Sequence, residues 1–141
     1  LDLRMVYDSY KPILLKVSPD LAHQQLDDII DYCLRSGIDG IVAGNTTRSR
    51  EGLTTISQEK IEEIGNGGMS GAPVHKKNLA LVKYIHEKSA GKLPIIGVGG
   101  IMSPEDAKAM LDAGASLVEI YSGFIFEGPG LVKRIIKHLE K

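Results

Sequence analysis

Short apolar runs alternate along this chain with longer segments in which apolar residues recur every three or four positions. The runs at residues 12–17, 40–44, 94–98 and 115–121 are rich in Val, Ile and Leu and predict strands. Each is followed by a segment of helical periodicity. Strands that alternate with helices are typical of a parallel sheet with right-handed crossovers. The pattern therefore predicts an α/β fold with four β–α units in series.

Capping signals mark the ends of two predicted helices. We expect Asp20 to cap the next helix and Gly37 to end it in the left-handed conformation. The apolar residues that recur at helical spacing in this helix are Leu26, Ile29, Ile30, Cys33 and Leu34. Ser103 followed by proline and two acids is a strong start for the helix after residue 98, which Gly114 ends. The other predicted helices span 75–90, with Leu79, Val82 and Ile85 inward, and 129–139, with Leu131, Val132, Ile135, Ile136 and Leu139 buried.

One connection is much longer than the others. Residues 45–74 hold the glycine-rich sequence GNGGMSGAP and no clear apolar period. Connections of about thirty residues are uncommon in compact domains and are usually functional.

The length of the chain limits the architecture. A closed (β/α)₈ TIM barrel needs about 250 residues, and this chain has 141. We therefore expect 1–141 to be a single partial domain, the C-terminal half of such a barrel. The start at Leu1 rather than Met fits a piece of a longer protein.

Composition excludes several classes of protein. The net charge of −1 gives no basic footprint for nucleic acid or an anionic membrane. No apolar run approaches the roughly 20 residues of a membrane-spanning helix. The single cysteine, Cys33, excludes an internal disulfide framework, fits a reducing compartment and is expected as a packed thiol.

Two groups of polar residues stand where the first two strands end, the usual place for reactive groups in a parallel barrel. Lys16 interrupts an apolar strand, which predicts either an anionic ligand group beside it or a lysine that reaches water at the strand end. Asn45 and Thr46 directly follow the second strand. Their amide and hydroxyl groups suit a polar heterocycle, or simply begin a turn.

Glycine-rich turns close the other two strands. Gly99-Gly100 and Tyr121-Ser122-Gly123 could form a cup of backbone N–H groups for a phosphate, or be tight strand-to-helix turns. Gly71 belongs to the long connection, where missing side chains would let a ligand approach the backbone.

Other chemistries lack their motifs. The histidines lie apart, are expected to be exposed, and predict no metal site. We find no Ser-His-Asp arrangement, no Walker-type loop and no convincing general base. The histidines are His23, His75, His86 and His138.

Taken in order, PILLKVSPD, GNTT, GGMSGAP, PIIGVGGI and ASLVEIYSGFIFEGPG resemble the C-terminal half of dihydroorotate dehydrogenase. The closing YSGFIFEGPG resembles the quinone-dependent, membrane-associated class 2 enzymes. The resemblance implies a TIM-barrel flavoprotein that uses FMN to oxidise dihydroorotate to orotate in pyrimidine (UMP) biosynthesis, with quinone as electron acceptor.

The resemblance also assigns site residues. It implies that Lys16 approaches the flavin ring, that Asn45 and Thr46 bind the orotate ring, and that three glycines line the FMN site through their backbone. Tyr121 and Ser122 would hold the FMN phosphate. The three glycines are Gly44, Gly71 and Gly100.

Two departures limit that assignment. The family commonly carries threonine where this chain has Gly44. The class 2 catalytic base is a serine in the N-terminal half, so no catalytic residue is expected in this chain, and the fragment is expected to be inactive alone. The quinone-admitting helices and peripheral attachment at the cytoplasmic side of the membrane would belong to the same missing part, while the fragment itself would be soluble and cytoplasmic.

Alternatives remain at this point. A phosphate-binding barrel isomerase of amino-acid biosynthesis would share the GVGGI-type loop, and a non-catalytic half-barrel would need no ligand. Half a barrel exposes strand edges and an apolar sheet face, so we also expect self-association.

Overall fold

The four predicted strands form one parallel sheet in a computed structural model that describes residues 10–51, 53 and 56–140. Neighbouring strands in the sheet are also consecutive along the chain, in the order β1-β2-β3-β4. This arrangement confirms the α/β prediction of four β–α units. The strands are β1 (Leu14–Val17), β2 (Gly40–Ala43), β3 (Ile95–Val98) and β4 (Leu117–Glu119).

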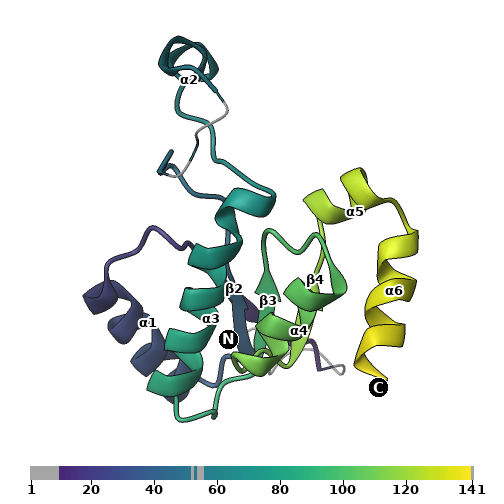
Figure 1. Cartoon of the computed structure of the whole chain (residues 1–141). Helices are drawn as coiled ribbons and strands as arrows, with labels where there is room; N and C mark the ends of the chain where they lie inside the picture. Colours follow the sequence, from purple (N-terminus) through teal and green to yellow (C-terminus); the bar gives the residue numbers. More distant parts are fainter. Residues whose placement is uncertain (1–9, 52, 54–55, 141) are drawn as a thin grey trace.

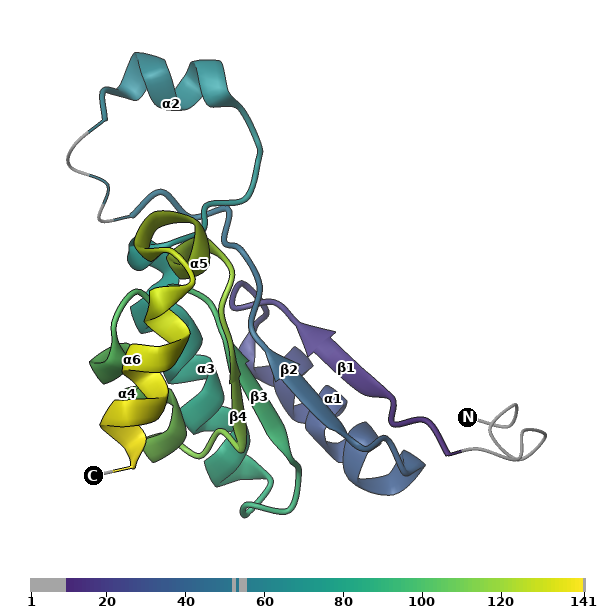
Figure 2. The ribbon, with the colours of Figure 1, turned by 90° about the vertical axis from the view of Figure 1, so that its right-hand side faces the viewer.

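Six α-helices and one short 3-10 helix are described between and after the strands. In both ribbon views the helices that pack on the sheet lie on one side of it, while the long connection carries a helix that projects from the molecule (Figures 1 and 2). The helices are α1 (His23–Ser36), α2 (Gln58–Ile64), η2 (Ala72–Val74), α3 (His75–Lys88), α4 (Pro104–Asp112), α5 (Ser122–Glu127) and α6 (Gly130–Leu139).

The two faces of the sheet differ because neighbouring residues of a strand point to opposite sides. On the covered face, Ile41 and Ile95 pair in register and both are fully buried against the helices. We call the other side the open face. There the register runs from Lys16 through Val42 and Ile96 to Leu117, and the first and last of these side chains are exposed.

The hydrophobic core lies between the covered face and the helices. It includes Cys33, which is 1% exposed, as expected for a packed thiol. Burial raises the pKa of this thiol and keeps it protonated. The predicted inward orientation of Val82 and Ile85 in α3 is confirmed, while Leu79 is partly buried at the edge of the core.

Some capping predictions are confirmed and one is wrong. Ser103 accepts a hydrogen bond from the backbone N–H of Asp106, and Gly37 ends α1 with a φ of 73°. Asp20 does not cap α1: the N-cap residue is Ala22, whose N–H donates to Gln25 Oε1. The carboxylate of Asp20 binds partners from other parts of the fold instead.

The last third contains two further corrections. Residues 122–127 form a separate helix, α5, before α6 begins at Gly130. Only Leu131 and Ile135 of the expected apolar stripe are buried, on the helix that packs against α4 and α5. The predicted burial of the other three residues is wrong: Val132, Ile136 and Leu139 are 40–52% exposed.

The prediction that all four histidines are exposed is also wrong in part. The side chain of His75 is 15% exposed, and its Nε2 lies 3.6 Å from Asp106 Oδ1. The reason is local: His75 begins α3 where that helix packs beside the loop after β3, and backbone atoms of His75 would contact a Cβ added at Gly100. His138 is partly covered as well, at 30%. Among the described residues no helix is long and apolar enough to cross a membrane.

Candidate functional site

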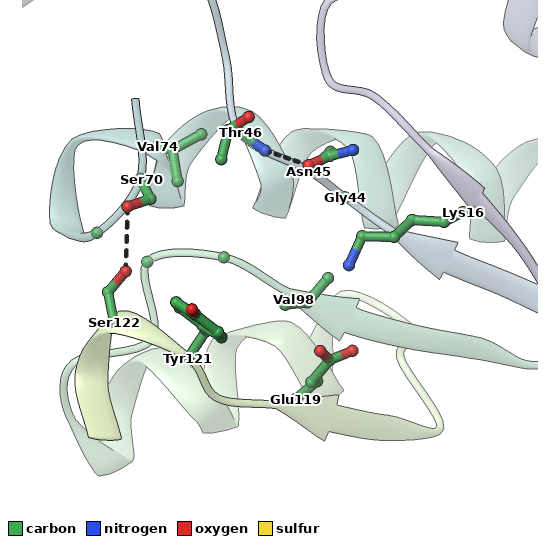
Figure 3. A pocket seen from close by; sticks show the side chains of 13 residues that line it. Lys16, Gly44, Asn45, Thr46, Ser70, Val74, Val98, Glu119, Tyr121 and Ser122 are labelled. Carbon is green, nitrogen blue, oxygen red and sulfur yellow. Dashed lines mark hydrogen bonds between the residues drawn. The ribbon is translucent and has the colours of Figure 1, made fainter. Parts of the chain in front are cut away.

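A cavity of about 230 Å³ opens where all four strands end (Figure 3). Its walls come from β1, the segment after β2, the loop after β3, the segment after β4, and the end of the long connection. Every site residue expected from the sequence lines this one cavity: Lys16, Gly44, Asn45, Thr46, Gly71, Gly100, Tyr121 and Ser122.

Lys16 supplies a positive charge on the open face. Its side chain is exposed and points into the cavity from β1 (Figure 3). Within the described residues its ammonium group has no ion pair or hydrogen bond. An unpaired ammonium in a cavity favours an anionic ligand group, which agrees with the first interpretation of this lysine.

Asn45 and Thr46 form a short polar wall beside Lys16. The N–H of Thr46 donates to Asn45 Oδ1 at 2.8 Å, which orients the Asn45 amide, and both side chains are exposed to the cavity side. The backbone oxygen of Asn45 accepts a hydrogen bond from Asn78 Nδ2 at 3.2 Å. Together the two residues offer amide and hydroxyl groups that can both donate and accept.

Asp20, Thr47 and Lys77 form a polar clamp directly behind this wall. Asp20 Oδ1 accepts from Thr47 Oγ1 at 2.5 Å and from Lys77 Nζ at 3.1 Å, and Asp20 Oδ2 accepts from the N–H of Arg48 at 2.7 Å. Thr47 is 1% exposed and pairs with Met69 through backbone hydrogen bonds in both directions. The clamp fixes the chain immediately after Thr46.

The hydrogen bond from Thr47 is the main reason that the pKa of Asp20 lies below its usual value. Burial opposes this shift and is the second-largest effect, while the backbone N–H of Arg48 and the Lys77 ammonium lower the pKa further. Sequence reasoning missed the clamp because an acid shortly before a helix is also the signature of a cap.

The loop after β3 comes close to α3. Gly100 is buried and has a φ of 73°, and a Cβ there would lie 2.6–2.7 Å from atoms of His75. Gly99 has a φ of 112°. A side chain is therefore strained at both positions, and the cavity is lined there by bare backbone.

Ser122 begins α5 and faces the end of the long connection. Its hydroxyl donates to Ser70 Oγ at 3.2 Å (Figure 3), and Gly71, with a φ of 79°, follows Ser70. Two hydroxyls and the glycine backbone at the loop after β3 thus share one end of the cavity with the exposed Tyr121 ring. This composition suits a phosphate.

Three residues at or behind the cavity were missed from the sequence. Ser70 lies in the glycine-rich run, for which only the glycines were expected to matter. Glu119 lies in β4, and only the register of that strand shows that its side chain faces the cavity. Asn78 is fully buried and lies behind the cavity wall rather than in its lining. A polar residue on the inward side of a helix is the signal that could have revealed Asn78.

The cavity lacks the groups for metal chemistry. Across the described ranges no three His, Cys, Asp or Glu side chains cluster as a metal site. Its lining instead combines one ammonium group, one carboxylate, an amide, several hydroxyls and glycine backbone. Such an arrangement can bind a phosphorylated ligand beside a polar ring.

Comparison with known proteins identifies a family. The model of the family described as dihydroorotate dehydrogenase matches residues 4–141. A dihydroorotate dehydrogenase (quinone) from Christiangramia forsetii is 50% identical over 132 residues, 93% of this chain and 37% of the relative. One from Proteus mirabilis is 42% identical over 139 residues, 99% of this chain and 40% of the relative.

Solved structures give the same result. The ligand-free enzyme of this type from Eimeria tenella aligns with a TM-score of 0.80 and 34% identity, over 89% of this chain and 34% of that one. The Eimeria tenella enzyme in complex with ferulenol aligns with a TM-score of 0.83 and 34% identity, over 93% of this chain and 34% of that one. The chain thus spans well under half the length of the proteins that it matches.

Proposed function

The chain belongs to the dihydroorotate dehydrogenase family, and we propose that it is the C-terminal part of a quinone-dependent enzyme that oxidises dihydroorotate to orotate. This reaction belongs to pyrimidine biosynthesis. The single observation that carries the proposal is the convergence of eight residues, named from their motifs, on one cavity. Family membership removes the alternative of an isomerase of amino-acid biosynthesis.

The residues present fit FMN. Gly99 and Gly100 have positive φ values, and a Cβ at either position would clash with Asn78 or His75 of α3, so both positions present only backbone to the cavity. The paired hydroxyls of Ser70 and Ser122 lie at the same end of the cavity, and the unpaired cation of Lys16 lies at the other. A phosphate at the first end, and beside the lysine a ring that gains negative charge on reduction, would match both.

When bound, FMN would supply the redox chemistry, accepting two electrons from dihydroorotate and passing them to a quinone. In this proposal Tyr121 and Ser122, with Ser70 and the backbone at Gly100, would hold the phosphate. Lys16 would stabilise the negative charge that the flavin ring gains on reduction.

Asn45 and Thr46 would bind the substrate ring. Their amide and hydroxyl match the alternating donors and acceptors of a pyrimidine dione, and the clamp behind them holds the backbone still. Positioning of this kind is worth several kcal/mol in an enzyme because it removes orientational freedom before the reaction.

We propose that the catalytic base lies outside this chain. The cavity of about 230 Å³ is smaller than the ~300–1,000 Å³ usual for ligand pockets, which supports a further wall from additional chain. The missing base, the quinone entry and peripheral attachment to the cytoplasmic side of the membrane would all reside in that additional part. In the same proposal the isolated 141 residues do not oxidise dihydroorotate and stay in the soluble, cytoplasmic fraction.

A chimera tests the proposal. The stretch of the Proteus mirabilis relative that matches this chain over 139 residues is replaced by the residues of this chain. We expect a yellow protein that carries FMN and reduces a quinone when dihydroorotate is added. The unaltered relative is the positive control, and the 141-residue chain alone should show no turnover.

Two results would contradict the proposal. A folded chimera that binds no FMN would exclude the assigned cofactor site. A chimera with FMN but no dihydroorotate oxidation would exclude the assigned reaction, and turnover by the chain alone would place the base within it.

A further inference from the structure

Asn78 is a buried amide in the first turn of α3. Its side chain is fully buried, at 0% exposure. The amide nitrogen donates to the backbone oxygen of Asn45 at 3.2 Å. The amide oxygen has no hydrogen-bond partner among the described residues. A buried carbonyl without a partner destabilises a fold, so a polar residue at this position needs an explanation.

Two glycines enclose this amide. A Cβ added at Gly44 would overlap the amide oxygen of Asn78, and a Cβ added at Gly99 would overlap its amide nitrogen. Gly44 follows β2 and Gly99 follows β3, and the N–H of Gly44 donates to the oxygen of Val98. The amide thus fills the space that side chains at two neighbouring strand ends would otherwise take.

Both glycines and Asn45 line the cavity, whereas Asn78 lies one layer behind them. From this placement we propose that Asn78 is a positioning residue, which holds Asn45 in its substrate-binding orientation through the amide between Gly44 and Gly99. The inference deepens the proposed function and rests on it, because Asn45 is assigned there to the substrate ring.

The geometry makes the residues at 44 and 78 dependent on one another. With Asn78 present, position 44 must be glycine because a methyl group overlaps the amide oxygen. With a short side chain at 78, a methyl group at 44 has room, and Leu81 Cδ2 at 3.0 Å is the flexible end of a side chain that can shift. The cost of a substitution at 44 should therefore depend on what stands at 78.

The test uses the FMN-loaded chimera with Asn78→Ser, with Gly44→Ala and with both substitutions. Gly40→Ala, alone and combined with Asn78→Ser, is the matched control. Gly40 lies at the opposite end of β2, and its Cβ would meet the backbone oxygen of Pro94 rather than Asn78. The readouts are the FMN content per protein and the affinity for orotate, followed through the change that orotate causes in flavin absorbance.

We expect Asn78→Ser to weaken orotate binding roughly five- to tenfold, the effect of one lost buried hydrogen bond, with FMN content unchanged. Gly44→Ala alone should weaken it by about tenfold or more. In the double variant the orotate affinity should return to that of Asn78→Ser. Any cost of Gly40→Ala should be the same whether or not Asn78→Ser is also present.

Four outcomes decide the matter. Unchanged orotate affinity in Asn78→Ser, or an equal cost of Gly44→Ala in both backgrounds, overturns the positioning role and leaves the proposed function standing. Loss of FMN together with orotate in Asn78→Ser would indicate a general structural role and overturns it too. An unmutated chimera that binds neither ligand removes both proposals together.

Discussion

The two faces of the same four-stranded sheet differ in almost every property. On the covered face Ile41 and Ile95 are fully buried against helices. On the open face Leu117 is 63% exposed and Lys16 reaches the cavity unpaired. Both faces are built by the same short strands, and each residue's side is decided by its parity along the strand.

The difference indicates which face is complete. On the covered face, helices pack on the sheet and bury its apolar side chains in the hydrophobic core. The open face carries apolar side chains without cover beside groups suited to a ligand. We infer that stability resides mainly on the first face and ligand binding on the second, and four predictions test this division.

The largest effect should come from adjacent isoleucines of β3. Ile95 lies on the covered face and Ile96 on the open face, where it is partly exposed. Ile95→Ala should lower the free energy of unfolding of the chain by about 2–5 kcal/mol because it leaves a cavity in the core. Ile96→Ala should cost about 1 kcal/mol. Urea unfolding of both variants measures the difference.

The same two substitutions, made in the chimera, also test whether the open face is covered there. If a further part of the chain covers the open face there, the cost of Ile96→Ala should rise toward that of Ile95→Ala. Equal costs in the isolated chain would contradict the distinction between the faces.

Removal of the open-face cation should come next. Lys16→Ala in the chimera should lower kcat for dihydroorotate oxidation by about 10²–10³-fold, the usual effect of removing one group that stabilises developing negative charge. Lys16→Arg should lower kcat by a smaller factor, because it keeps the positive charge. Lys83→Ala is the matched control, since it removes an exposed lysine from the outer surface of α3. A chimera that retains full kcat without Lys16 would show that the cavity cation has no part in the reaction.

Self-association of the isolated chain should depend on the open face. We expect the 141-residue chain to form dimers at micromolar concentration through its uncovered apolar residues. Leu117→Lys should weaken this association about tenfold, because one leucine side chain no longer becomes buried. Sedimentation velocity measures the shift.

The control is Ile64→Lys, which adds the same charge on the projecting α2, where Ile64 is 56% exposed. Equal effects of the two substitutions would mean that association does not involve the sheet. A chain that stays monomeric would contradict the expectation altogether.

The smallest effect concerns the clamp of Asp20, Thr47 and Lys77, which connects the segments after β1 and β2 with α3. Hydrogen bonding from Thr47 lowers the pKa of Asp20 in the folded state. A lowered pKa contributes stability above the unfolded value of about 3.9, and this contribution is lost as the pH falls through the folded pKa. Asp20→Asn should therefore cost about 1 kcal/mol at pH 7.

The cost of Asp20→Asn should shrink below about pH 4, where the wild-type carboxyl also becomes protonated. Unfolding curves of both proteins between about pH 3 and pH 7 measure it, and the subtraction cancels the other acids, including Asp27, whose pKa is also lowered. A difference independent of pH would show that the charge of Asp20 contributes nothing.

Much of the fold and the site was predictable from local patterns. The strands, the Ser103 cap, the end of α1 at Gly37 and the parallel topology follow from periodicity and chain geometry. The cavity residues followed because parallel strands present their C-terminal ends at one edge. The errors arose where local signals have two meanings: Asp20 could cap a helix or bind a distant hydroxyl, and the apolar stripe of α6 could be covered or left exposed.

By itself, the sequence determined which residues form strands and helices, which family the chain resembles and which eight residues to inspect, because these depend on neighbours in the chain and on motif order. Only the tertiary structure decided that Asp20 joins Thr47 and Lys77, that Ser70 meets Ser122, and that the Asn78 amide lies between Gly44 and Gly99. The hydrogen bonds among these join residues 27 to 57 positions apart. Distances across space depend on how whole elements pack, and no local pattern encodes that packing.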